Sequence, residues 1–344
     1  MEIILIILAV LIILCVAVYW LLASMYRKSF GRHSEPNARR FTYGYDFYAQ
    51  RYPRREVVFS GKAAELHAFI YGECNNKALV IFAHGIGSQH EDYLSTITWL
   101  VDHGYRVFAP DLSGSGASTG SPTGLSQSAI DMDTVLSYIE AEPQLKLLPK
   151  VLMGHSWGSY GVGAVLNYGH DVKAVVNVAG YNDPVDMIAF IFRLTLGKLG
   201  DVVKPFLRLH HRIHFGKSGL YRVVDGINQA NIPVLVVQGA EDPINTPGGT
   251  SIYAYRKNIV NPMVEYLYIT KQNCAGHGEV FHTDEANEEM ARLHQESKTK
   301  ADFTEEELEA YLDEFHAQVN KALMSIPNEE FMKRVDRFFK KSIV

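Results

Sequence analysis

The sequence has few cysteines, no excess of basic charge and no metal-binding motif. Its three cysteines, Cys15, Cys74 and Cys274, are too few and too scattered for a disulfide framework or a CxxC zinc site. No HExxH pattern occurs either, so no metal and no cofactor are expected. A net charge of −5 argues against a dedicated nucleic-acid-binding protein, which would usually be basic. A length of 344 residues with 47% hydrophobic residues is typical of one large domain, or of a domain with an insertion.

Charge is also absent from Ile3 to Ala23. At about 1.5 Å per residue this run makes roughly 31 Å of helix, which matches the hydrocarbon core of a bilayer. A cleaved signal peptide would have a positive start and a shorter apolar core, but Met1 and Glu2 supply no Lys or Arg. A buried core helix is disfavoured because nothing interrupts the apolar run. The sequence therefore predicts a transmembrane anchor over residues 1–26.

Basic residues follow this run, and none precedes it. By the positive-inside rule, the rest of the chain is expected in the cytoplasm. Residues 27–55 are predicted to form a basic juxtamembrane linker facing anionic headgroups, and residues 56–344 the folded domain. A chain that starts near Arg39 is expected to be soluble and active. The basic residues of the linker are Arg27, Lys28, Arg32, Arg39, Arg40, Arg51, Arg54 and Arg55.

Short apolar runs alternate with helical patterns along the rest of the chain. Several runs are rich in Ile, Val and Leu without clean alternation, as in strands buried on both faces of a parallel sheet. This order predicts a doubly wound α/β fold. The expected strands are 66–71, 78–83, 106–109, 150–153, 173–178, 233–238 and 264–269, and the expected helices are 95–103, 125–140, 159–168 and 249–257.

Two stretches break the alternation. Residues 183–230 are apolar and basic, and are expected to form a helical cap inserted over the carboxyl edge of the sheet. Phe190 and Phe192 in this cap suit an apolar acyl group, although ordinary helix packing is the favoured explanation. Residues 279–314 are strongly acidic, and a solvated helical face is the favoured interpretation.

The pattern G-x-S-x-G occurs twice. At Gly154-His155-Ser156-Trp157-Gly158 it follows the apolar run Val151–Met153 and precedes a helix rich in small residues. This is the strand, sharp turn and helix of a nucleophile elbow, whose helix N-terminus favours a developing anion. At Gly116–Gly120 no strand enters the pattern directly, so a structural loop is expected there.

With these motifs the chain resembles the α/β-hydrolase superfamily, most closely the serine aminopeptidase and monoacylglycerol-lipase-like branch. The resemblance covers about Glu56 to Lys341, outside the anchor and linker. It implies the α/β-hydrolase fold and a serine hydrolase. The matching motifs are His84-Gly85-Ile86-Gly87, the segment from Gly104-Tyr105 through Asp111 to Gly114-Ser115-Gly116, the Ser156 elbow, Gln238 to Asp242, and Gly276-His277.

A serine nucleophile needs a histidine base and a carboxylate to hold it. The superfamily's order of Ser, acid and His implies Ser156, Asp242 and His277. Glu241 is the alternative acid, and His282 is the alternative base.

Two backbone donors are expected to form the oxyanion hole. One is the N–H of Trp157, after the nucleophile, and the other is most plausibly that of Ile86. His84 and Gly85, like Gly154, His155 and Gly158, are expected to support the motifs by loop packing. Cys274 lies near His277 but lacks a strand–turn–helix context, so a bystander thiol is expected.

The leading hypothesis is a membrane-anchored serine hydrolase that cleaves esters or amides of a small-molecule or lipid acyl substrate through an acyl-enzyme. A serine aminopeptidase and an acyltransferase remain alternatives on the same triad. A non-catalytic, membrane-tethered binding protein with a relic fold is the alternative of another class. Retention of Ser156, Asp242 and His277 at the expected positions counts against a relic.

Overall fold

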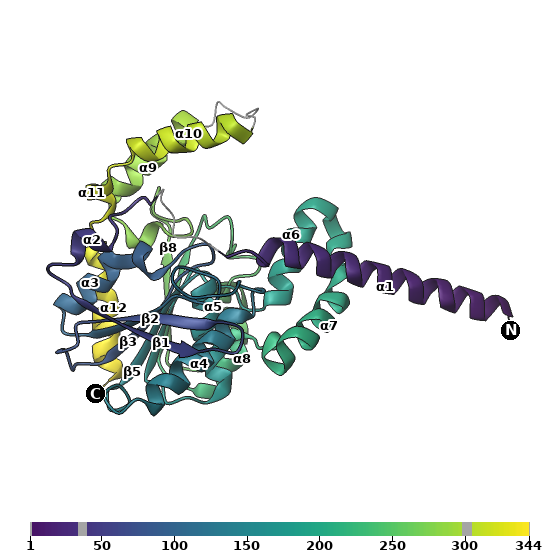
Figure 1. Cartoon of the computed structure of the whole chain (residues 1–344), viewed down its shortest axis with the longest axis horizontal. Coiled ribbons are helices and arrows are strands. Elements are labelled where there is room, and N and C mark those ends of the chain that lie inside the picture. The colour runs from purple at the N-terminus through teal and green to yellow at the C-terminus, as the bar shows by residue number, and fades with distance from the viewer. Residues whose placement is uncertain (1, 34–39, 298–304, 344) are drawn as a thin grey trace.

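The computed structural model of the chain describes residues 2–33, 40–297 and 305–343 (Figure 1). Eight strands form one sheet in the order β1-β2-β4-β3-β5-β6-β7-β8. β2 is antiparallel to β1 and β4, and the strands from β3 to β8 run parallel. The strands are β1 (Arg54–Ser60), β2 (Glu65–Tyr71), β3 (Leu79–Ala83), β4 (Arg106–Pro110), β5 (Lys150–His155), β6 (Ala174–Val178), β7 (Val234–Gly239) and β8 (Val264–Ile269).

Strands β3, β5, β6 and β7 are buried along their whole length, which explains their continuous apolar sequences. The strand β1 was not expected. It begins at Arg54, two residues before the expected domain boundary, and its mostly exposed residues follow no long apolar run. Its place at the sheet edge, antiparallel to β2, accounts for this polar sequence.

Helices cover both faces of the sheet (Figure 1). On one face α3 (Leu94–Asp102) and α12 (Glu329–Ser342) pack over an apolar core, and on the other α4 (Gln127–Ala141), α5 (Trp157–Ala164) and α8 (Val223–Ala230) pack over a second core. Short 3-10 helices are η1 (His90–Tyr93), η2 (Val165–Tyr168), η5 (Ile252–Asn258) and η6 (Glu279–Phe281). The helix expected over residues 249–257 is thus the 3-10 helix η5.

The segment between β6 and β7 forms the cap. Asp183 caps its first helix by accepting hydrogen bonds from the N–H groups of Val185 and Asp186, and Pro184 occupies the first turn. The last helix of the expected insertion, α8, packs against α5 and so belongs to the layer on the sheet. The cap proper consists of α6 (Pro184–Leu196), η3 (Gly197–Val203), α7 (Lys204–Phe215) and η4 (Gly216–Leu220).

The apolar N-terminus forms α1 (Glu2–Phe30), which leaves the body of the molecule beside the cap (Figure 1). Most of the helix is exposed and apolar, and it is long enough to cross a membrane. Its last turns are different, because Leu22, Ala23 and Tyr26 are buried and the helix contacts α7. A chain starting near Arg39 would lack Tyr26, which belongs to the core, and its activity stays a prediction.

The segment that follows α1 is not a free linker. Arg40 and Arg54 both form ion pairs with Glu91, so their charges face the domain rather than anionic headgroups. The segment includes the short helix α2 (Tyr45–Tyr48), and Arg39 lies outside the described residues.

A helical arm extends from the body and contains most of the acidic residues 279–314 (Figure 1). The arm comprises α9 (Asp284–Ser297), α10 (Glu305–Gln318) and α11 (Lys321–Met324), and a small apolar cluster holds these helices together.

Candidate active site

Ser156 lies in the turn between β5 and α5 with a backbone φ of 54° and ψ of −113°. A non-glycine residue adopts such a conformation only where the surrounding structure holds it there. Here the N–H of Ser156 donates to the carbonyl of Val178 at 2.9 Å. A Cβ on Gly154 would lie 2.5 Å from the carbonyl oxygen of Gly158, and one on Gly158 would lie 2.1 Å from that of Ala83. Both glycines of the motif are therefore required by close backbone packing.

Asp242 and His277 meet beyond the carboxyl ends of β7 and β8. The imidazole Nδ1 of His277 is 2.9 Å from Oδ2 of Asp242, whose side chain is fully buried. The other oxygen, Oδ1, accepts the backbone N–H groups of Ile244 and Asn245, both at 2.9 Å. A carboxylate held in this way makes Nδ1 of His277 the protonated nitrogen and leaves Nε2 able to accept a proton.

The two alternative residues do not join this pair. Glu241 is exposed on the surface, although it precedes Asp242 directly. His282 directs its Nδ1 to the carbonyl of Met324 at 3.2 Å, in contact with the chain that leads to α12. The geometry therefore favours Asp242 and His277 over these alternatives.

A chain of hydrogen bonds connects the residue before Ser156 to His277. Tyr93 Oη lies 2.8 Å from His155 Nδ1, and His155 Nε2 lies 3.0 Å from the carbonyl oxygen of His277. Burial is the main cause that lowers the pKa of His155 to about 3, so the ring is neutral at pH 7. Because a carbonyl only accepts, Nε2 of His155 donates to it, and the hydroxyl of Tyr93 donates to Nδ1.

This chain also reaches the loop after β3, because the N–H of Gly85 donates to Tyr93 Oη at 3.3 Å. A Cβ built on Gly85 would lie 3.6 Å from the Cβ of Ser156, so this loop passes close to the nucleophile candidate. His155 thus does more than pack a loop, and no sequence signal had pointed to Tyr93.

His84 fixes the same loop. Its Nε2 accepts the N–H of Leu112 at 2.9 Å, and its Nδ1 donates to the carbonyl of Gly85 at 2.7 Å. Burial lowers the pKa of His84, which keeps the ring in the neutral form that can both donate and accept. Ile86 follows in the exposed part of the loop.

Trp157 begins α5, so its backbone N–H is one of the first of the helix, which lack partners within the helix. Its indole Nε1 donates to the carbonyl of Leu125 at 2.9 Å, and its own carbonyl accepts the hydroxyl of Ser128 at 2.9 Å. The orientation of Trp157 is therefore set by both side chain and backbone.

The second G-x-S-x-G match is part of a structural loop. The hydroxyl of Ser118 is buried and donates to the carbonyl of Asp111 at 2.6 Å. The carboxylate of Asp111 accepts from His90 and from the N–H of Ala117. Burial alone would raise the pKa of this carboxyl, but the neighbouring histidine rings and these hydrogen bonds hold it below the usual range. A Cβ on Gly116 would collide with this carboxylate at 2.1 Å.

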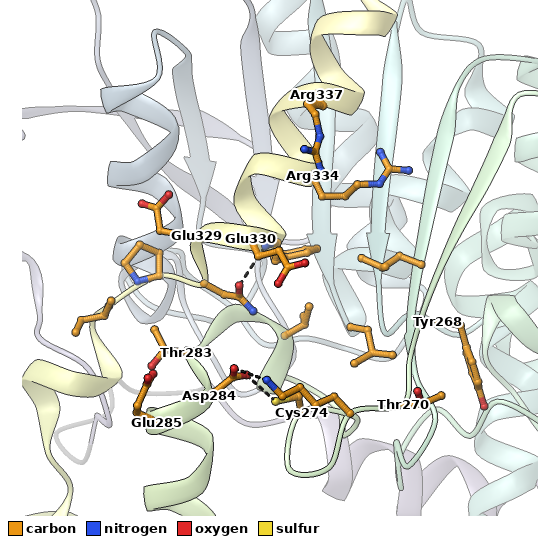
Figure 2. Close-up of a pocket in the computed structure, with 18 residues that line it drawn as sticks. Tyr268, Thr270, Cys274, Thr283, Asp284, Glu285, Glu329, Glu330, Arg334 and Arg337 are labelled. Carbon is orange, nitrogen blue, oxygen red and sulfur yellow. Dashed lines mark hydrogen bonds and ion pairs between the residues drawn. The ribbon is translucent and has the colours of Figure 1, made fainter.

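A pocket of about 560 Å³ lies between β8, the start of α9 and α12 (Figure 2). Cys274 lines it and directs Sγ to Oδ1 of Asp284 at 3.3 Å. The lining does not include Ser156, Asp242 or His277, so this pocket lies apart from the candidate site. The described part of the chain holds no group of three or more His, Cys, Asp or Glu side chains placed to bind a metal ion.

Comparison with solved structures agrees with this architecture. The esterase Pf2001 of Pyrococcus furiosus matches with a TM-score of 0.58 and 17% sequence identity, covering 91% of this chain and 98% of the esterase. A second crystal form matches with a TM-score of 0.55 and 17% identity, covering 89% of this chain and 99% of the esterase. At 17% sequence identity, the similarity to these esterase structures establishes the fold alone.

The sequence adds a family match. Residues 74–218 match the family model described as Serine aminopeptidase, S33, over the segment from before β3 to the end of the cap. The chain has the α/β-hydrolase fold, and the family match, over less than half of its length, supports a serine hydrolase. The order of its strands is that of an open, mostly parallel hydrolase sheet. No curated protein matches the sequence of this hydrolase.

Proposed function

We propose that this hydrolase is anchored in a membrane by α1 and cleaves carboxylic esters through an acyl-enzyme on Ser156. His277 removes the proton of the Ser156 hydroxyl through Nε2, and Asp242 holds the ring by Nδ1 and stabilises its positive charge. The backbone N–H groups of Trp157 and Ile86 stabilise the oxyanion of the tetrahedral intermediate. His277 then returns the proton to the leaving alcohol, and a water activated by His277 releases the acyl group from Ser156.

One observation carries this proposal. The Nδ1 of His277 faces a fully buried carboxylate whose other oxygen accepts two backbone N–H groups. A carboxylate anchored in this manner cannot turn away from the ring, which keeps Nε2 of His277 available as the base. The positive φ of Ser156 at the start of α5 supports the role of nucleophile, because it is the conformation of a nucleophile elbow.

The substrate proposal rests on the cap and the anchor. The cap helix α6 carries an apolar run from Met187 to Phe192, and Phe190 approaches the loop after Asp242, since its Cε2 would lie 3.7 Å from a Cβ on Gly249. An apolar cap of this kind favours an apolar acyl group, including that of a lipid monoester. The basic residues Arg27 and Lys28 in the last turn of α1 favour a cytoplasmic hydrolase domain.

A fluorophosphonate probe tests the nucleophile. The wild type should be labelled, and Ser156→Ala should not, whereas Cys274→Ser should be labelled like the wild type. Cys274 is the matched control because it is a half-buried thiol close in sequence to His277. Labelling of a folded Ser156→Ala variant would reject Ser156 as the nucleophile.

A substrate panel separates esters from amides. Aryl esters of increasing chain length, monoacylglycerols and aminoacyl amides would be compared at equal enzyme concentration. The proposal predicts turnover of esters that rises with chain length. Turnover of aminoacyl amides alone would replace the esterase assignment with an aminopeptidase on the same residues.

A further inference from the structure

The cap helix α7 has two different faces. Leu207, His210 and His211 are buried toward the domain. The opposite face is exposed and carries two stripes that run along the helix, about 100° apart around its axis, as residues four apart lie on nearly the same side of a helix. Leu209 and Ile213, which are 51% and 59% exposed, form one stripe, and the exposed Arg208 and Arg212 form the other.

The buried face of α7 packs against α1, and both exposed stripes border this contact. His210 packs against Tyr19 and Tyr26 of α1 with ring centroids 6.1 Å and 4.7 Å away, and His211 packs against Tyr26 with ring centroids 5.4 Å away. Around the helix axis, His210 neighbours Ile213 of the apolar stripe, and His211 neighbours Arg208 of the basic stripe. Apolar and positively charged surface therefore lie side by side next to the apolar helix.

A buried hydrogen-bond network fixes the packing of α1 against α7. The hydroxyl of Tyr26 accepts the N–H of Leu125 at 3.1 Å and donates to Nε2 of His211 at 3.2 Å. His211 in turn is tied through Nδ1 to Ser126 at 2.8 Å and to the carbonyl of Gly219 at 3.2 Å. If α1 crosses a bilayer, the exposed face of α7 is thereby held at a fixed place beside the membrane surface.

The apolar area continues beyond α7. Figure 1 shows α6 and α7 beside the point where α1 leaves the body. Ile191 and Leu194 of α6 and Val202 of η3 are exposed as well. Arg208 and Arg212 are exposed and form no ion pair with any described residue, although the charge of Arg208 also acts on the buried carboxylate of Asp183. We refer to Ile191, Leu194, Val202, Leu209 and Ile213, together with Arg208 and Arg212, as the cap face.

We propose that the cap face rests on the bilayer that α1 crosses, with its apolar side chains among the lipid tails near the surface and its arginines on anionic headgroups. This inference rests on the membrane anchoring of the proposed function. A helix with an apolar stripe beside a basic one lies in a membrane interface in this way, and each basic residue near an anionic surface adds to the attraction. The occupant of the cap face is thus a lipid surface, and the active-site cap is held at the membrane from which lipid esters would come.

Site-directed fluorescence of the full chain in vesicles tests the proposal. Cysteines labelled with a polarity-sensitive dye would be placed singly at Leu209 and Ile213 in a Cys15→Ser, Cys74→Ser, Cys274→Ser background. Leu147 and Val260, which are 81% and 77% exposed and lie outside the cap, serve as matched apolar controls. We expect nitroxide lipids to quench the dye at Leu209 and Ile213 several-fold more than at the controls.

Native Cys15 separates this inference from the anchoring itself. It lies within the exposed part of α1, so a dye on Cys15 reports insertion of the helix. Quenching at Cys15 without quenching at Leu209 and Ile213 would overturn the docking while leaving the anchor intact. Absence of quenching at Cys15 would reject the anchor, and the docking with it.

A second experiment tests the role of Arg208 and Arg212. Phosphatidylglycerol added to phosphatidylcholine vesicles should increase the quenching at Ile213, and Arg208→Gln with Arg212→Gln should abolish that increase. Lys271→Gln, at an exposed lysine outside the cap, should not change it. The dye at Ile213 could instead report a less polar environment that depends on protein concentration and is not quenched by nitroxide lipid. That result would assign the cap face to a second copy of the chain and overturn the proposal.

Discussion

At the scale of single residues, the close packing around Ser156 depends on neighbouring glycines, which have no side chain. Gly154 and Gly158 allow β5, α5 and the end of β3 to approach within distances that no side chain permits. The positive φ of Ser156 is maintained because its backbone is hydrogen-bonded on both sides, to Val178 and to Tyr160. Such a half-buried, strained serine requires its neighbours to be rigid.

Gly158→Ala is therefore expected to lower the free energy of unfolding by about 1–3 kcal/mol, because its Cβ would overlap the carbonyl of Ala83 at 2.1 Å. Gly248→Ala is the matched control, since a Cβ there meets nothing within 4 Å and its φ is not positive. Denaturant unfolding of both variants is the measurement. Equal stability of the two variants would contradict the close-packing argument.

At the scale of elements, the buried strands could be predicted and the role of α1 could not. The apolar runs at β3, β5, β6 and β7 identify strands because both faces of each are covered. The edge strand β1 has charged and exposed residues, so no such run marks it. The hydropathy of α1 predicts a span but says nothing of its last turns, whose partners lie in α7, far along the chain.

The contact of α1 with the cap makes a specific prediction for Tyr26. Tyr26→Phe in the full chain should cost about 1–3 kcal/mol of unfolding free energy, because the N–H of Leu125 and Nε2 of His211 lose their partner. Turnover of a soluble short-chain ester should also fall, since the carbonyl of Leu125 holds the indole of Trp157.

Thermal unfolding in detergent measures this effect, with Trp20→Phe as the control because Trp20 is largely exposed. A chain that begins at Arg40 should be less stable still. Full stability and activity of that shortened chain would show that the packing of Tyr26 does not matter.

At the scale of the whole molecule, several buried histidines are held neutral. Burial lowers the pKa of His155 to about 3 and those of His210 and His211 to about 4, against an ordinary value of 6.5. The unfolded chain therefore binds more protons than the folded one between about pH 4 and 6.5, and stability falls as pH drops through that range. Burial raises the pKa of Asp131 to about 6 and also raises that of Asp183, and these two carboxyl groups act in the opposite sense.

His210→Phe should make the loss of stability below pH 6.5 less steep, by up to roughly 1.4 kcal/mol per pH unit for the one proton removed. The ring contact with Tyr26 is kept, and Nδ1 of His210 forms no hydrogen bond with the described residues. Denaturant unfolding between pH 5 and pH 8 measures the slope. An unchanged slope would mean that His210 takes up no proton on unfolding in this range.

The residues of the candidate site could be predicted from the sequence, but the contacts that hold them could not. Ser156, Asp242 and His277 were named from motifs and their order, because each follows a strand that ends at the same edge of a parallel sheet. The hydrogen-bond chain through Tyr93 and His155 could not be named, because it depends on side-chain directions that no motif encodes.

The central claim is that Ser156, Asp242 and His277 act as one catalytic unit, and a double-mutant cycle tests it most directly. Values of kcat/KM for a soluble aryl ester would be measured for Ser156→Ala, His277→Ala and the double variant, each with an unchanged unfolding midpoint. We expect each single variant to lose about 10⁴–10⁶ in turnover and the double variant to lose little more. Losses that multiply in the double variant, or near-wild-type turnover in a folded Ser156→Ala variant, would contradict the account.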